Sequence, residues 1–292
     1  MHTRSPCPEE YGPIVHTRPL GTSRSLTALR ATSAPAAEQL GDPFSPAPRA
    51  VVFDYGLTLV TWHDPRPMLL EAMEEVRPWL GTDPPTAEEI VDAILAPIDR
   101  ALPSLAELAE VDYLDHFARG WWSAGFDLAP ATLLRILDRE QSCWDRAARP
   151  APDALPTLDG LQERGILTGL CSNAPFPPQL MRRQMATVGV LQRMDAIALS
   201  SEVGWRKPAA QLYQAVLHML HVEPEEALFV GDQAREDWFG PRAIGMRAVL
   251  CEALARSPAP PGAATISRLG ELLEHLPQGR RKPASASGAR PR

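Results

Sequence analysis

VVFDYGLTL, residues 51–59, is the segment around which this chain is organised. Its first three residues are β-branched or aromatic, which is typical of a strand buried inside a parallel sheet. Asp54 follows directly, and open α/β sheets bind ligands in the crevice beyond the carboxyl ends of their strands. Gly56 allows a sharp turn or a close backbone approach at that point. The stretch predicts a strand with a functional carboxylate at its tip, although an ordinary strand followed by a solvated turn has the same pattern.

From residue 150 onward, helical periodicity alternates with short apolar runs. Further strands are expected at 166–171, 196–199, 227–230 and 246–250, and helices at 153–164, 178–188, 208–221, 240–244 and 267–276. Strands that alternate with helices are typical of a parallel sheet with helices on both faces. We therefore predict an α/β fold with a doubly wound, three-layer, Rossmann-like parallel sheet of five strands.

The region between the first two strands, residues 65–149, is helical in period throughout. Four helices are expected there, at 68–80, 86–102, 104–124 and 131–146. Thr86 followed by Glu89 predicts a capping box at the start of the second. We expect a helical cap at 65–149 inserted into an α/β core formed by 49–64 and 150–277. Residues 1–48 and the basic segment 278–292 are polar and non-periodic, and we predict that both are disordered.

Composition excludes several classes of protein. The 292 residues carry a formal net charge of −7, which argues against a general nucleic-acid binder. The four cysteines are scattered without metal-ligand spacing and indicate reduced thiols. No apolar run reaches the roughly 18–20 residues that span a bilayer, and no signal-peptide pattern opens the chain. We expect a cytoplasmic protein without membrane or nucleic-acid partners, and the sequence does not indicate its oligomeric state.

Polar residues follow each predicted strand at its carboxyl end. Asp54 ends the first strand and Ser172-Asn173 the second, while Trp205, Lys207, Asp232 and Asp237 follow the third and fourth. Right-handed crossovers place all these tips on one edge of the sheet. Each residue alone has an ordinary role, such as a turn cap or a solvated charge. Their occurrence in order at successive tips predicts a single site.

With these motifs the sequence resembles the haloacid dehalogenase superfamily, in its helical-cap branch. The four ordered motifs are residues 53–59, the strand ending in Ser172-Asn173, residues 202–208, and residues 229–232 followed by Asp237. The resemblance covers about residues 49–252. It implies a phosphohydrolase that depends on Mg²⁺ and acts on a small phosphorylated metabolite.

The resemblance also implies a role for each matched residue. Asp54 would be the nucleophile that forms an aspartyl-phosphate, Ser172 would bind a phosphoryl oxygen, and Lys207 would neutralise charge. Mg²⁺ would be held by Asp54, Asp232 and the backbone carbonyl of Gly56, with Asp237 holding Lys207 or a metal-bound water. Thr58, Asn173 and Trp205 are predicted to contact the substrate.

One position departs from the family pattern. Phosphatases of the family usually carry a second aspartate two residues after the nucleophile, as general acid and base, and here that residue is Gly56. General acid–base help contributes about 10²–10⁴-fold in rate. Two alternatives therefore stay open: a catalytically weakened member that acts as a binding or interaction protein, and a metal-independent 2-haloacid dehalogenase. Dehalogenases of the family typically lack an acid at the position that matches Asp232.

Overall fold

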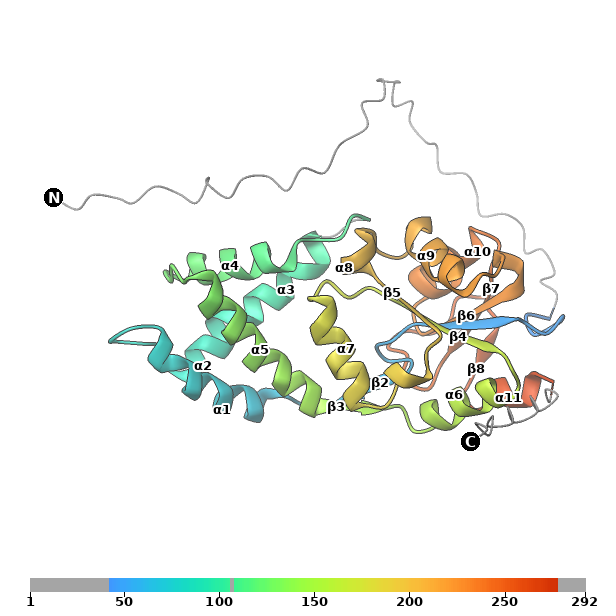
Figure 1. The fold of residues 1–292 in the computed structure, drawn as a ribbon, viewed down its shortest axis with the longest axis horizontal. Helices are drawn as coiled ribbons and strands as arrows, with labels where there is room; N and C mark the ends of the chain where they lie inside the picture. The colour runs from blue at the N-terminus through green and yellow to red at the C-terminus, as the bar shows by residue number, and fades with distance from the viewer. Residues whose placement is uncertain (1–41, 106–107, 278–292) are drawn as a thin grey trace, which may run out of the picture. The chain divides into compact units, whose positions relative to one another are not determined.

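The structure, a computed structural model, describes residues 42–105 and 108–277. Within these residues a six-stranded sheet has the order β5-β4-β1-β6-β7-β8, and every neighbouring pair is parallel (Figure 1). Its strands are β1 (Ala50–Phe53), β4 (Leu167–Ser172), β5 (Ala196–Leu199), β6 (Ala227–Gly231), β7 (Arg247–Cys251) and β8 (Thr265–Ile266). The predicted α/β fold is confirmed.

Helices cover both faces of the sheet because successive strand residues point to opposite sides. Val51 and Phe53 pack in one hydrophobic cluster, and Ala50 and Val52 pack in another on the opposite face. The first face is covered by α6 (Ala154–Glu163), α7 (Pro178–Thr187) and α11 (Glu271–His275), and the second by α9 (Ala210–Leu220), η5 (Ala234–Phe239) and α10 (Gly240–Arg242). Short connections are η3 (Leu191–Arg193), α8 (Ser200–Val203) and η4 (Pro224–Glu226).

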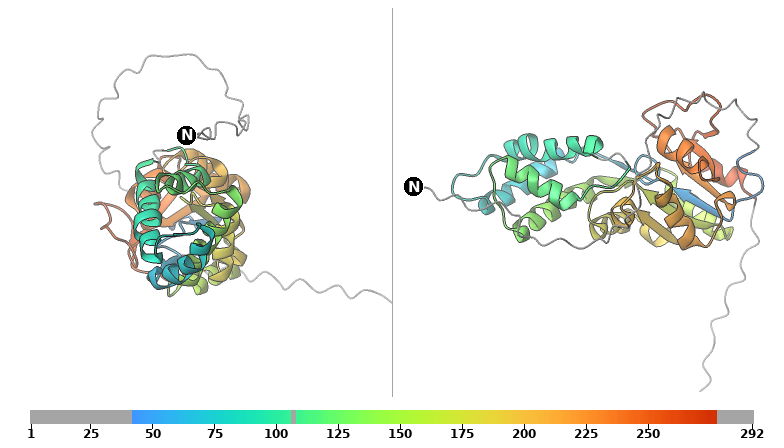
Figure 2. Two further views of the ribbon diagram at one scale, coloured as in Figure 1. Left: turned by 90° about the vertical axis from the view of Figure 1, so that its left-hand side faces the viewer. Right: turned by 90° about the horizontal axis from the view of Figure 1, so that it is seen from above.

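A helical insertion follows β1 and is entered and left through a two-stranded antiparallel ribbon. The ribbon pairs β2 (Val60–Trp62) with β3 (Ala148–Pro150). The inserted elements are α1 (Arg66–Val76), η1 (Arg77–Trp79), α2 (Ala87–Glu89), η2 (Ile90–Leu95), α3 (Ala96–Leu105), α4 (Tyr113–Ser123) and α5 (Pro130–Ala147). Figure 2 shows these helices gathered beside the sheet. Their apolar sides form a core of their own around Trp121, Phe117 and Ile136.

The insertion, called the cap below, is tied to the core next to the third predicted motif. The N–H of Arg206 donates to the carbonyl of Leu108 at 2.7 Å, and Ala109 pairs with Trp205 in an antiparallel bridge. The Arg206 guanidinium contacts the Glu110 carboxylate at 2.9 Å, and the two side chains are 17% and 3% exposed. We call residues 108–110 and 204–206 the cap strap.

Several helix boundaries differ from the expectation. The helix predicted at 104–124 begins only at Tyr113, because Asp112 caps it by accepting the N–H of Asp115 at 3.1 Å, while residues 108–110 pair with the core. The helix predicted from Pro208 begins at Ala210. The last helix is limited to Glu271–His275. The capping box of Thr86 and Glu89 is confirmed.

The predicted disorder of residues 1–48 is wrong for residues 42–48. Phe44 stacks on His275 with ring centroids 4.3 Å apart, and Arg247 donates to the carbonyl of Pro43 at 3.1 Å. The stacking of Phe44 and the hydrogen bond to the carbonyl of Pro43 hold this segment against the core. Residues 1–41 and the predicted tail 278–292 lie outside the described residues.

Two strand features were also not expected. β8 adds a sixth strand to the sheet, and the ribbon of β2 and β3 forms at the entrance to the cap. Both consist of two- or three-residue strands, which are too short to show an apolar alternation. No helix within the described ranges combines the length and the apolar character needed to cross a membrane.

Breaking the cap strap is expected to destabilise the protein. Replacing Glu110 by alanine leaves Arg206 largely buried without its counter-charge, which should cost about 3 kcal/mol in the free energy of unfolding. Urea unfolding of Glu110→Ala, Arg206→Met and the double variant measures the coupling. Asp115→Asn, which removes an ion pair exposed on both sides, is the control and should stay within about 1 kcal/mol. Additive effects of the two strap substitutions would contradict this prediction.

Candidate active site

The site lies where the chain order of the sheet reverses. β1 lies between β4, which leads on to β5, and β6, which leads on to β7. Loops leaving β1 and β6 therefore diverge and open a crevice at their carboxyl ends. Asp54 stands directly after β1, is 7% exposed, and donates its backbone N–H to the carbonyl of Val230 at 2.9 Å. The sheet thus fixes the backbone of this carboxylate.

Lys207 bridges two buried carboxylates. Its Nζ atom lies 2.6 Å from Oδ1 of Asp54 and 2.7 Å from Oδ1 of Asp237. Burial lowers the pKa of Lys207, but the charges of Asp237 and Asp54 outweigh it and hold this pKa well above its ordinary value. The lysine is therefore a permanent cation between two acids.

Asp237 orders the loop after β6. Its second oxygen, Oδ2, accepts the backbone N–H groups of Asp232 at 3.1 Å and Gln233 at 2.9 Å. A Cβ atom on Gly231 would lie 2.3 Å from the Asp237 carboxyl carbon, so only glycine allows this approach. Both oxygens of Asp237 are engaged, which makes it a positioning residue for Lys207.

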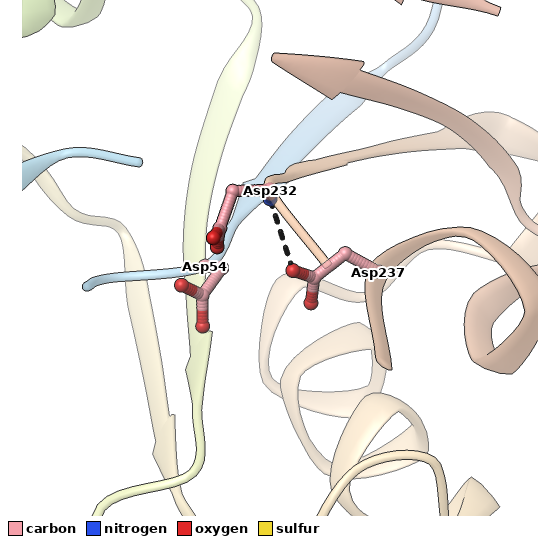
Figure 3. Close-up of side chains that lie close together, drawn as sticks. All are labelled: Asp54, Asp232 and Asp237. Atoms are coloured by element: carbon pink, nitrogen blue, oxygen red, sulfur yellow. Dashed lines mark hydrogen bonds between the residues drawn. The ribbon is translucent and has the colours of Figure 1, made fainter. Parts of the chain in front are cut away.

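Asp232 has a buried oxygen, Oδ1, without a hydrogen-bond partner. One ligand atom each of Asp54, Asp232 and Asp237 lies within 4.8 Å of the others, and Figure 3 shows the three side chains close together. An orphaned buried carboxylate oxygen is costly, and hard divalent cations prefer such oxygen ligands. The residues present fit a divalent cation at Asp54 and Asp232.

The pKa values of both acids reflect this shortage of positive charge. Burial raises the pKa of Asp54 to about 6, against the opposing charge of Lys207. Burial, together with the charges of Asp54 and Asp237, raises the pKa of Asp232 to about 7. One lysine therefore does not compensate three acids.

The two residues after β4 take different roles. Ser172 is 5% exposed and lines the same cavity as Asp54 and Lys207. Asn173 also lines it, but its amide holds the backbone of Lys207. Its Oδ1 accepts the Lys207 N–H at 2.7 Å, and its Nδ2 donates to the Lys207 carbonyl at 3.3 Å. Asn173 thus fixes the loop that carries the lysine.

Two predicted substrate contacts are not brought to the cavity. Thr58 is 1% exposed and is not among the residues that line it. Trp205 is 38% exposed and belongs to the cap strap. Both lie close in sequence to residues of the site, and sequence proximity alone does not give the direction of a side chain.

The cavity above Asp54 holds about 450 Å³ and is also lined by residues that the sequence did not single out. They include Tyr55, Trp62, Asp99, Gln141, Trp144 and Gln184. Gln184 links the loop after β1 to the cap helix α5. Its side-chain oxygen accepts a hydrogen bond from the Tyr55 hydroxyl at 3.3 Å, and its side-chain nitrogen donates one to Asp145 on α5 at 3.4 Å. Positions 137, 141 and 144 on α5 share one face of the helix, and their spacing predicts that this face points inward. The spacing does not tell whether the face lines a cavity or packs in a core.

Gly56 faces the ring of Trp62. A Cβ atom at position 56 would lie 3.2 Å from the Trp62 ring, which is tighter than an ordinary van der Waals contact. Trp62 thus limits the space into which a side chain at position 56 would extend. The next residue, Leu57, has a φ of 57°, a conformation that is strained for a leucine.

Similarity to known proteins identifies the family of this chain. Residues 48–245, more than half of the chain, match the haloacid dehalogenase-like hydrolases. The chain belongs to this hydrolase family. A HAD phosphatase from Thermococcus onnurineus has the same fold, with a TM-score of 0.53, 24% identity, and coverage of 79% of this chain and 99% of that one.

Two curated relatives match over shorter stretches. Phosphoserine phosphatase from Thermus thermophilus is 34% identical over 123 residues, 42% of this chain and 48% of its own. Ribulose-1,5-bisphosphate 5-phosphatase from Halopiger xanaduensis is 29% identical over 155 residues, 50% of this chain and 64% of its own. In both, the match covers less than two thirds of the relative's length.

Protons and a divalent cation are expected to compete for the site. The raised pKa values of Asp54 and Asp232 mean that the cation-free folded protein binds more protons than the unfolded chain between about pH 4 and 7. Its stability should therefore fall as the pH rises through this window. Added cation should restore it, with an affinity that falls about tenfold per pH unit between about pH 7 and 6 and more steeply below, where both carboxylates take up a proton.

Thermal unfolding with and without 10 mM MgCl₂ at pH 5.5 and 8 checks this. We expect a rise in Tm at pH 8 that shrinks at pH 5.5 and is lost in Asp232→Asn. A rise in Tm of equal size at both values would contradict the prediction.

Proposed function

We propose that this protein is a Mg²⁺-dependent phosphohydrolase that cleaves a small phosphorylated metabolite through an aspartyl-phosphate on Asp54. The observation that supports the proposal best is the charge arrangement at the cavity floor. Asp54 is in contact with Lys207, and Asp232 beside it has an unpartnered oxygen. The two curated relatives are phosphatases of two different metabolites, which supports the reaction class and leaves the substrate open.

The residues divide the reaction into two steps. An oxygen of Asp54 attacks phosphorus, the bond from phosphorus to the ester oxygen breaks, and the departing alkoxide takes a proton from water. Water then attacks the phosphorus of the aspartyl-phosphate and gives its proton to the hydroxide left by the first step, which releases inorganic phosphate and regenerates the carboxylate. Lys207 stabilises the negative charge that accumulates on the phosphoryl oxygens, and Ser172 donates a hydrogen bond to one of them.

Mg²⁺ would be held by Asp54, Asp232 and the carbonyl of Gly56, beside Asp237. When bound, it would offset the repulsion between the carboxylate nucleophile and the anionic substrate. Asn173 and Asp237 keep Lys207 in place during both steps, since they hold its backbone and its ammonium group.

The dehalogenase alternative fits the site less well. Its nucleophile attacks carbon and has no need of a second acid beside it, whereas Asp232 is kept here, buried and with its Oδ1 atom unpartnered. The weakened-member alternative is motivated by Gly56, since no acid stands at that position. A cytoplasmic location stays a prediction.

A panel of phosphorylated metabolites with and without Mg²⁺ tests the proposal. We expect turnover that EDTA abolishes, a loss of at least about 10³-fold in kcat/KM for Asp54→Asn, and about 10²-fold or more for Lys207→Met. Asp127→Asn, an exposed aspartate of the cap, is the matched control and should keep full activity. Wild-type rates no higher than those of Asp54→Asn on every substrate would favour the weakened member. Turnover of 2-haloacids without metal would favour the dehalogenase.

A carboxylate restored at position 56 should raise the rate once the space is free. We expect Gly56→Asp combined with Trp62→Phe to increase kcat on alkyl phosphates about 10–100-fold over Trp62→Phe alone. The gain should be smaller on p-nitrophenyl phosphate, whose leaving group needs no protonation. Gly56→Asn in the same background has the same size without the acid. An equal gain for the asparagine variant would show that the effect is not general acid catalysis.

A further inference from the structure

The cap carries acidic side chains that the hydrolytic steps do not use. Asp99 of α3 lines the cavity that Asp54 and Lys207 line at its floor. Glu140 of α5 is 4% exposed, and its Oε2 atom has no hydrogen-bond partner. Tyr113 of α4 is 3% exposed, and its hydroxyl is also unpartnered. Three neighbouring cap helices thus each contribute one of these groups (Figure 1).

These three groups act on one another. The charge of Asp99 raises the pKa of Glu140, in addition to the larger effect of burial. Burial also raises the pKa of Asp99 to about 6, against the opposing charge of His116. The charges of Glu140 and Asp99 add to the effect of burial in raising the pKa of Tyr113. Two carboxyl groups and one hydroxyl group therefore lie close enough to influence one another electrostatically.

The protein supplies little to neutralise this cluster. Neither carboxylate forms an ion pair with a lysine, arginine or histidine of the described residues. The Nε2 atom of His116 is already engaged by the carbonyl of Ile98 at 2.8 Å. Buried carboxylates are normally paired, so a ligand with positive charge and several N–H donors would complete the arrangement.

We propose that the cap end of the cavity binds a cationic group of the substrate, a primary ammonium, against Asp99 with Glu140 and Tyr113 behind it. The inference rests on the proposed function and names its substrate class: phosphate monoesters that carry an amine at the end opposite the phosphate. The cavity then has matched ends, with Lys207 facing the phosphoryl group and Asp99 facing the ammonium. Substrates with an anionic group at that end, such as a second phosphate, are disfavoured by repulsion.

Matched alkyl phosphates separate charge recognition from size. The probes are ω-aminoalkyl phosphates with two to five methylenes, each compared with the ω-hydroxyalkyl and n-alkyl phosphates of equal length. For the best length we expect kcat/KM to favour the amine about 10- to 100-fold over its neutral analogues. An ω-carboxyalkyl phosphate of that length should be the poorest substrate.

The residues that recognise the ammonium group are identified by a ratio, kcat/KM for the amine ester divided by kcat/KM for the neutral ester of equal length. Asp99→Asn should reduce it to within about threefold of one, and Glu140→Gln should reduce it about three- to tenfold. Glu88→Gln, an exposed cap residue, should leave the ratio unchanged. Since a ratio compares two substrates on one variant, a general loss of folding or activity does not move it.

The outcomes separate the two proposals. Hydrolysis of all esters with no preference for the amine overturns this inference and leaves the phosphohydrolase proposal standing. The absence of hydrolysis above the level of Asp54→Asn overturns the phosphohydrolase proposal instead. In that case calorimetric titration of the wild-type protein with aminoalkyl and hydroxyalkyl phosphates decides, and equal affinities for the two overturn the inference.

Discussion

The contact of Lys207 with Asp54 and Asp237 is the interaction on which the rest of the site depends. A lysine this deeply buried is tolerated only because two carboxylates lie within 2.7 Å of it. Those carboxylates, with Asp232, then exceed the lysine in charge, and the surplus is visible as an unpartnered oxygen and raised pKa values. The folded protein therefore has an excess of negative charge at the place where it is proposed to receive a cation and an anionic ester together.

The sheet and the cap contribute differently to this site. Parallel strands bring residues 54, 172 and 232 to one edge through hydrogen-bonded register, so their backbones are fixed by β1, β4 and β6. The cap contributes side chains from helices, which set the far wall of the cavity. The floor is thus suited to a reaction common to the family, while the wall is free to vary with the substrate.

Much of the floor could be predicted from sequence, and little of the wall. Asp54, Ser172 and Asp232 stand at the ends of apolar runs, Lys207 follows the loop after another, and topology alone brings such positions together. Asp99 and Glu140 lie within amphipathic helices, where the sequence gives the helix and its inward stripe but not the neighbours it meets. α4 begins later than predicted for the same reason. Residues 108–110 pair with a segment almost a hundred residues away, which the local sequence does not reveal.

The cap strap ties the helical insertion to Arg206, the residue directly before Lys207. Leu108 accepts the N–H of Arg206, and Lys207 is the next residue. A displacement of the insertion large enough to part this bridge would take away a backbone partner directly before the charged side chain. The position of the cap and the backbone position of Lys207 are therefore joined through one short stretch of main chain.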